Sequence, residues 1–195
     1  DLPSLQAILP VGILHKNPTI SAQQLRDVKL ETGPVSAAME ELLSMMTSYT
    51  HEILAPPDFP GISWTSFWNT YQTDFSDTNN LSMVTFLNCN GTKILIPGDV
   101  ETEGWIKLLS NENFCRNLYD VNVFIASHHG RENGYCEDVF DICNPVVFIF
   151  SDGPKKYATQ EMRDVYASHA SGIVFNGNNR QVLTTRSDGT LSWNL

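Results

Sequence analysis

Basic residues are scarce in this sequence. It has 12 Lys and Arg against 22 Asp and Glu, which gives a net charge of −10 over 195 residues. This balance argues against broad, nonspecific adhesion to nucleic acid or to anionic lipid. It leaves room for a phosphate-bearing substrate, because metal ions can invert the local electrostatic field.

Long apolar runs are also missing. No stretch approaches the roughly 18 apolar residues of a membrane span, and no basic segment followed by an apolar one opens the sequence as a secretory signal would. The four cysteines form no Cys-x-x-Cys pair, which argues against a zinc ribbon or a thioredoxin-like motif. We therefore expect a cytoplasmic protein with no membrane contact and with buried, reduced thiols.

The length of the chain and its 42% hydrophobic residues fit one globular domain over residues 1–195. Residues 1–80 and 81–195 nevertheless differ in their patterns. In the first part, the apolar spacing predicts helices over 2–9, 21–30 and 36–49. The apolar and Pro/Gly patterns also predict one buried strand over 11–14 and one ordered aromatic loop over 56–75.

The second part interleaves buried apolar strands with helices. An Asn-Gly pair between the first two apolar runs indicates a hairpin turn. This alternation predicts an α/β protein with a mixed sheet and helices on its outer face. The predicted strands are 82–87, 93–96, 121–126, 146–150, 172–175, 181–185 and 191–193, and the predicted helices are 101–109, 137–142 and 159–169.

Two predicted strands end in side chains that carry chemistry. Asp99 follows one strand directly after a glycine, and His128 and His129 follow the next. Strand ends are where α/β proteins place their sites, and imidazole with carboxylate suits Zn²⁺, Mn²⁺ or Fe. Taken singly, a Gly-Asp pair is more often a structural turn and a His pair more often solvated. Their joint position at two strand ends is what points to a metal site.

From residue 79 onward the sequence resembles the second half of the metallo-β-lactamase fold. The resemblance is to the branch that contains the hydrolase domain of bacterial competence (DNA-uptake) proteins, and it implies an αββα sandwich. It rests on motifs in the right order: Asn79-Asn80-Leu81-Ser82, Gly98-Asp99, His128-His129-Gly130-Arg131 extending to Tyr135, and Thr185-Arg186-Ser187-Asp188-Gly189.

The resemblance implies a metal role for three residues. Asp99 matches the family's metal-bridging aspartate, and His129 aligns best with its last histidine ligand. His128 is then a neighbour able to touch a substrate oxygen or to protonate a leaving group, although the roles of the two histidines could be exchanged. Two divalent ions, Zn²⁺ or Mn²⁺, are the implied cofactors.

Substrate contacts are implied for further residues. Asn80, or its neighbour Asn79, falls near a further ligand position of the family, where an amide would orient water or substrate. Arg131 and Arg186 are candidates for phosphate contact, because a guanidinium matches phosphate oxygens. The alternative for each arginine is an ordinary surface ion pair.

The principal metal motif of that family, His-x-His-x-Asp-His, does not occur in this sequence. Residues 1–5, Asp-Leu-Pro-Ser-Leu, resemble what often follows that motif. We therefore expect the chain to be a C-terminal portion, with 1–80 holding the end of the first half and 81–195 the second half. An upstream segment or a partner chain would complete the site, and an oligomer is possible. The alternative is a naturally shortened, metal-free relative.

The leading functional hypothesis is a metal-dependent hydrolase of phosphodiester bonds, either a nuclease or a nucleotide phosphodiesterase. Its substrate would be a nucleic acid or a nucleotide, and basic residues of the second part, Lys155 and Lys156 among them, would help to form a phosphate-facing rim. A lactone or thioester substrate remains open because one fold hosts many chemistries. The alternative is a non-catalytic binding or assembly module, or a partner-dependent component of a bacterial defence system.

Overall fold

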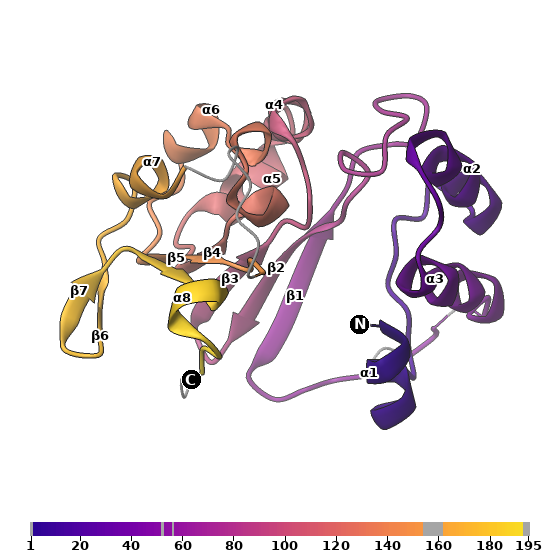
Figure 1. Ribbon diagram of the computed structural model, residues 1–195, viewed down its shortest axis with the longest axis horizontal. Helices are drawn as coiled ribbons and strands as arrows, with labels where there is room; N and C mark the ends of the chain where they lie inside the picture. Colours follow the sequence, from indigo (N-terminus) through magenta and orange to yellow (C-terminus); the bar gives the residue numbers. More distant parts are fainter. Residues whose placement is uncertain (1, 52, 56, 154–161, 193–195) are drawn as a thin grey trace.

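A computed structural model describes residues 2–51, 53–55, 57–153 and 162–192. It shows an α/β protein in which a mixed six-stranded sheet lies beside a group of N-terminal helices (Figure 1). The helices are α1 Leu2–Ile8, α2 Ala22–Thr32, α3 Ala37–Ser48, α4 Thr102–Leu109, α5 Glu112–Leu118, α6 Glu137–Phe140, α7 Arg163–Ala167 and α8 Thr185–Asp188. The strands are β1 Ile62–Phe67, β2 Val84–Cys89, β3 Thr92–Ile96, β4 Val123–Ile125, β5 Val147–Phe150, β6 Ile173–Phe175, β7 Asn178–Arg180 and β8 Val182–Thr184.

The order of strands in the main sheet is β1-β2-β3-β4-β5-β8, and β6 pairs only with β7. The pairs β1/β2 and β2/β3 are antiparallel, whereas β3/β4, β4/β5 and β5/β8 are parallel. The predicted hairpin is confirmed, and its Asn90-Gly91 turn has the positive φ angles of 49° and 88° that such a turn requires. The carboxyl ends of β3, β4, β5 and β8 therefore meet at one edge of the sheet.

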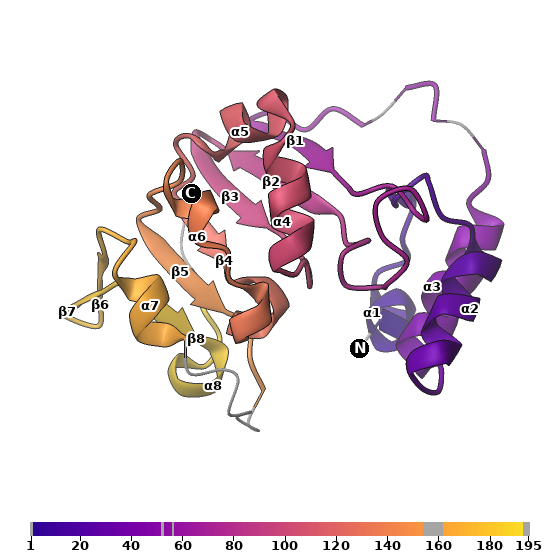
Figure 2. The same ribbon diagram turned by 90° about the horizontal axis from the view of Figure 1, so that it is seen from above.

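One face of the sheet is covered by helices and is called here the helix face. Figure 2 shows α4, α5, α6 and α7 lying over it. Alternate residues of the strands point into this layer and form the main core, whose largest members include Leu95, Phe124 and Phe148 with Trp105 of α4. The aromatic rings of Trp105 and Phe148 both pack on Phe124, with centroids 6.0 and 5.2 Å away.

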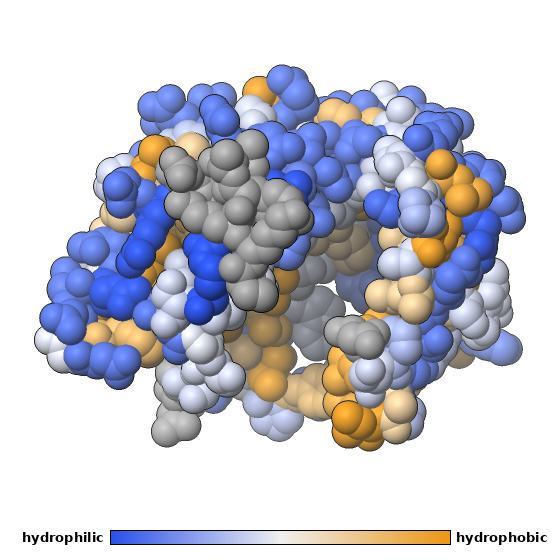
Figure 3. All heavy atoms as spheres, viewed as in Figure 1, coloured by the Kyte–Doolittle hydropathy of each residue, from blue (hydrophilic) through white to orange (hydrophobic). Residues whose placement is uncertain are grey.

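The opposite face of the sheet is called here the open face. Over β5 and β8 it is covered by β6 and by Leu191 near the carboxyl end of the described chain. Over β1 to β3 it leaves Ile62, Trp64 and Ile96 about 40% exposed, at 42, 42 and 40%. Figure 3 shows apolar residues lining the hollow between this part of the sheet and the N-terminal helices.

The N-terminal helices are fixed to the sheet by a buried amide. The Nδ2 atom of Asn17 donates hydrogen bonds to the carbonyl oxygens of Asn69 and Leu81, at 3.0 and 3.1 Å. The predicted helices over 21–30 and 36–49 are confirmed as α2 and α3. Each begins at a serine N-cap, and that of α2 is a full capping box between Ser21 and Gln24.

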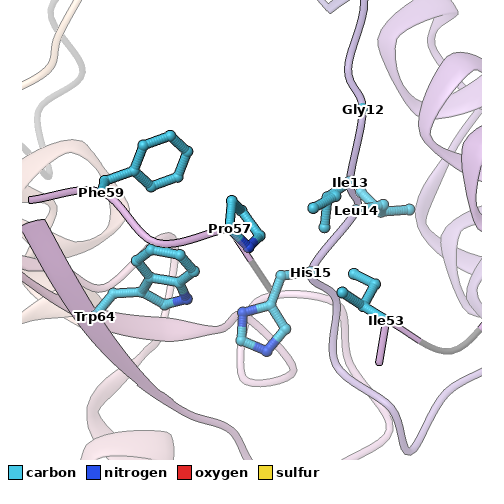
Figure 4. Close-up of a pocket in the computed structure, with 8 residues that line it drawn as sticks. All are labelled: Gly12, Ile13, Leu14, His15, Ile53, Pro57, Phe59 and Trp64. Atoms are coloured by element: carbon cyan, nitrogen blue, oxygen red, sulfur yellow. The ribbon is translucent and has the colours of Figure 1, made fainter. Parts of the chain in front are cut away.

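Several predictions about the elements were wrong. The segment 11–14 forms no strand; Pro10 precedes it, and Ile13 is 41% exposed. This segment instead lines an apolar cavity of about 680 Å³ opposite Trp64 (Figure 4). The predicted aromatic loop contains β1. Its Ser and Thr residues obscure the strand pattern, in which Ile62 and Trp64 lie on one side and Phe67 on the other.

Three smaller differences lie in the second part of the chain. Helix α5 was missed, although Asn111 caps it by accepting from the backbone N–H groups of Asn113 and Phe114. The turn expected at 187–189 is instead entered through the one-turn helix α8, and residues 191–192 form no strand. Of the predicted helix 159–169, the described part forms α7, while residues 159–161, like Lys155, Lys156 and Trp193, lie outside the described residues.

Two expectations about the chemistry of the chain can be compared with the structure. The four cysteines are free; Cys136 and Cys143 are buried as expected, whereas Cys89 and Cys115 are only half-buried. Burial raises the pKa of the Cys143 thiol to about 12. Among the described residues, no helix has both the length and the apolar character needed to cross a bilayer.

Candidate functional site

The two motifs of the predicted metal site lie on adjacent parallel strands. Asp99 follows β3 and the two histidines follow β4, and backbone hydrogen bonds join the two loops. The N–H of His128 donates to the carbonyl of Gly98 at 3.1 Å. The hydroxyl of Ser82 accepts from the N–H of Asp99 at 3.2 Å, so the acid loop is also held from the β2 side.

Asp99 and His129 face each other across this junction. The Nε2 atom of His129 lies 3.7 Å from Oδ1 of Asp99, and the side chains are 51 and 43% exposed. The Nδ1 atom of His129 lies 2.6 Å from the carbonyl oxygen of Ser151, which follows β5. A carbonyl only accepts, so Nδ1 carries a proton in this contact, and Nε2 is the ring nitrogen that lies toward Asp99.

An unusual turn brings His129 to this position. His128, His129 and Gly130 all have positive φ angles, of 48, 58 and 76°. Each left-handed residue other than glycine costs about 1–2 kcal/mol, so this turn has to be held by its surroundings. At Gly130 even a Cβ atom is excluded, because it would lie 2.3 Å from the ring of Phe150.

His128 is buried and contacts Glu101 and Arg131. The residue is 8% exposed, and its Nδ1 lies 3.4 Å from Oε1 of Glu101. Its Nε2 lies 3.2 Å from a guanidinium nitrogen of Arg131. Of the two histidines, the structure therefore places His129 beside the acid, while His128 and Arg131 form an adjoining pair.

Asn80 and Asn79 have different surroundings. The buried Asn80 side chain donates to Asp77 at 3.1 Å, and its Oδ1 accepts from the N–H of Glu101 at 3.0 Å. The Asn80 side chain therefore supports the start of α4. The Nδ2 atom of Asn79 donates to Oε1 of Glu101 at 2.8 Å. Sequence reasoning missed Glu101, which was only the first residue of the predicted helix over 101–109.

Arg186 lies at the carboxyl end of β8, at the same edge of the sheet. Its Nη2 lies 3.0 Å from Oδ2 of Asp152, whose side chain is 1% exposed. The other oxygen of Asp152 accepts from the N–H of Arg186 at 3.0 Å. Asp152 directly follows Ser151, whose carbonyl accepts from His129. The Arg186–Asp152 ion pair is therefore next in sequence to a residue that contacts His129.

The described residues contain no group of three or more His, Cys, Asp and Glu side chains arranged to hold a metal ion. Asp99 and His129 are thus two candidate ligands, fewer than the three protein ligands that a catalytic zinc ion usually has. No family model matches the chain, and no match is found among curated proteins.

Proposed function

We propose that the protein is a metal-dependent hydrolase of the metallo-β-lactamase superfamily, acting on phosphodiester bonds as a nuclease or nucleotide phosphodiesterase in the cytoplasm. The observation that carries this proposal is the Asp99–His129 pair, with Nε2 and Oδ1 only 3.7 Å apart. Ligand atoms of a zinc site each lie about 2.0–2.2 Å from the ion, so a separation below about 4 Å is compatible with one shared ion.

The surroundings of His129 support a ligand role. A metal-binding histidine usually donates its second ring nitrogen to a carbonyl or carboxylate, which orients the ring. The contact of His129 with Ser151 has this form. When bound, Zn²⁺ or Mn²⁺ supplies Lewis acidity that makes water a nucleophile near neutral pH. In the proposal, Asp99 and His129 hold the cofactor, which in the complete protein is a pair of ions.

The neighbouring cationic groups support a phosphate-bearing substrate. Arg131 lies against His128, and Arg186 is fixed by the buried Asp152, one residue from the acceptor of His129. These two arginines would bind phosphate oxygens beside the metal ligands, and His128 would act on the substrate through its contact with Arg131. Asn80 would act indirectly, by supporting the loop that leads into α4.

The open face supports the proposal that another segment completes the fold. Parallel strands are ordinarily buried on both faces, yet around β3 the open face leaves Ile96 40% exposed. We propose that a β-layer from an upstream segment or a partner chain covers this face, making the αββα sandwich, and brings further metal ligands. The same face favours a second candidate, an assembly module that uses this surface and has no metal chemistry.

Metal binding by the 195-residue chain tests the proposal. Titration with Zn²⁺ and with Mn²⁺ is expected to show saturable binding that D99A or H129A abolishes. The exposed residues His51 and Asp138 provide matched controls, H51A and D138A, which should bind as the unaltered chain does. Binding unchanged in D99A, or no saturable binding even when the completing segment or partner chain is present, would overturn the hydrolase and leave the assembly module.

A further inference from the structure

Three side chains converge on a single carboxylate oxygen next to the proposed metal site. Glu101 lies between β3 and α4, and its Oε1 accepts from the side-chain amides of Asn79 and Asn133, at 2.8 and 2.7 Å. The third group is Nδ1 of His128, 3.4 Å away. Asn79 precedes β2, and Asn133 follows the histidine turn. Glu101 therefore ties together the loops around the Asp99–His129 pair.

Glu101 stands at the N-cap position of α4 but makes no side-chain capping hydrogen bond. A carboxylate whose role was to cap the helix would accept from the first backbone N–H groups of the helix. This carboxylate turns toward the loops instead. The exposed Glu103, in the first turn of the same helix, has the same charge near the same helix end and is a natural control.

The His128 ring has complementary neighbours on its two nitrogens. A guanidinium only donates hydrogen bonds, so Nε2 of His128 accepts from Arg131. The proton of the neutral ring then lies on Nδ1, the atom that faces Glu101. At 3.4 Å this contact is longer than a good hydrogen bond, and Nδ1 makes no hydrogen bond among the described residues, so it is a weak polar contact between the ring N–H and an acceptor oxygen. Arg131 therefore sets the tautomer of the ring, and the Glu101 oxygen is a polar neighbour that favours this orientation of the ring.

The fixed ring matters because the backbone of His128 and His129 is left-handed. Such a backbone persists only where the surroundings over-determine it. The buried ring of His128 and the hydrogen bond from its backbone N–H to the Gly98 carbonyl hold the first residue of the turn. The second residue, His129, is thereby placed beside Asp99.

We propose that Glu101 is a positioning residue. Through its Oε1 it holds His128 and the loop of Asn133, and so keeps the left-handed turn in the form that sets His129 against Asp99. The role requires an acceptor oxygen rather than a charge, because all its partners are N–H donors. The metal-binding part of this inference rests on the proposed function, whereas the tautomer of His128 does not.

Three variants test the proposal: E101Q, E101L and the matched control E103Q. In the metal-free chain, two-bond ¹H–¹⁵N correlation spectra of the histidine rings should show His128 with its proton on Nδ1, and E101Q and E103Q should keep this pattern. E101L should keep the proton on Nδ1, because Arg131 sets the tautomer, but it should shift the ring signals of His128, because the ring loses the oxygen that orients it. In Zn²⁺ titrations, E101Q and E103Q should bind within about threefold of the unaltered chain, and E101L about 10–100-fold more weakly.

The outcomes separate the alternatives. A proton on Nε2 of His128, an unchanged spectrum in a folded E101L, or an E101Q as damaged as E101L would each overturn the proposal. If the unaltered chain binds no Zn²⁺, the titrations give no comparison between variants, and the ring spectra alone decide whether Glu101 positions His128. Circular dichroism melting curves identify a variant that fails to fold, in which case the spectra of the unaltered chain and of E101Q decide.

Discussion

The two faces of the sheet carry equally apolar side chains but differ in what covers them. On the helix face, Leu95, Phe124 and Phe148 are at most 1% exposed, whereas on the open face Ile62, Trp64 and Ile96 are 40 to 42% exposed. Because the hydrophobic effect scales with area removed from water, the helix face should supply most of the stability of this chain. On the open face, part of the apolar area stays in contact with water.

Truncating a core ring is the strongest test of this difference. Phe124→Ala removes a ring that packs on Trp105, Phe140 and Phe148, and should lower the free energy of unfolding by about 3–5 kcal/mol. Trp64→Ala on the open face should cost about 1 kcal/mol or less. Urea unfolding curves of both variants give the comparison, and similar losses would show that the open face is as important for folding as the core.

The histidine turn extends the comparison to the candidate site. Gly130→Ala should cost about 2–4 kcal/mol, because the new Cβ would meet the ring of Phe150 on the helix face and φ is +76°. Gly177 has almost the same φ of +77°, but a Cβ atom added there would meet no other atom within 4 Å. Gly177→Ala therefore isolates the backbone cost of about 1 kcal/mol, and urea unfolding curves measure both losses. Equal losses would mean that Phe150 does not constrain the turn.

Charge on the open face should change association rather than folding. We expect the chain to self-associate or to be poorly soluble, because exposed apolar sheet surface favours contacts between molecules. The double variant W64K/I96K should shift sedimentation velocity profiles toward the monomer without lowering the unfolding midpoint appreciably. A sharply melting monomer in the unaltered chain would contradict the view that this face needs a cover.

Thiol chemistry gives the mildest test. Cys89 lies at the end of β2 and is half-buried, whereas Cys143 lies in the main core. Burial raises the pKa of Cys143 to about 12, so its reactive thiolate is rare at pH 8 and grows only as the pH approaches that value. Iodoacetamide at pH 8 should therefore label Cys89 well before Cys143, and mass spectrometry of the peptides reads the order. Equal rates would place both thiols in similar surroundings.

Continuous apolar runs made the centre of the sheet predictable. β3, β4 and β5 read directly as buried strands, and the rule that strand ends meet at one edge predicted that Asp99 and a histidine come together. β1 was missed because Ser63, Thr65 and Ser66 dilute its pattern, and its place depends on pairing with β2, a contact that no local pattern contains.

The inner part of the site was not predictable in the same way. Which of His128 and His129 faces Asp99 depends on a left-handed turn, and the sequence offers only Gly130 as a sign of it. The partners of Glu101 come from loops 22 and 32 positions away, at Asn79 and Asn133. Side chains so far apart in sequence meet only after the sheet has set the loops, so local propensity contains no trace of the contact.

The buried amide of Asn17 has a mechanical consequence for the whole chain. By donating to the carbonyls of Asn69 and Leu81, it joins the segment before α2 to the loop that leads from Asn79 into β2. Hydrogen bonds therefore connect the segment before α2 with the loop whose Asn79 donates to Glu101. A macromolecule that bound these helices would be linked to the histidine turn by hydrogen bonds, without contacting the turn itself.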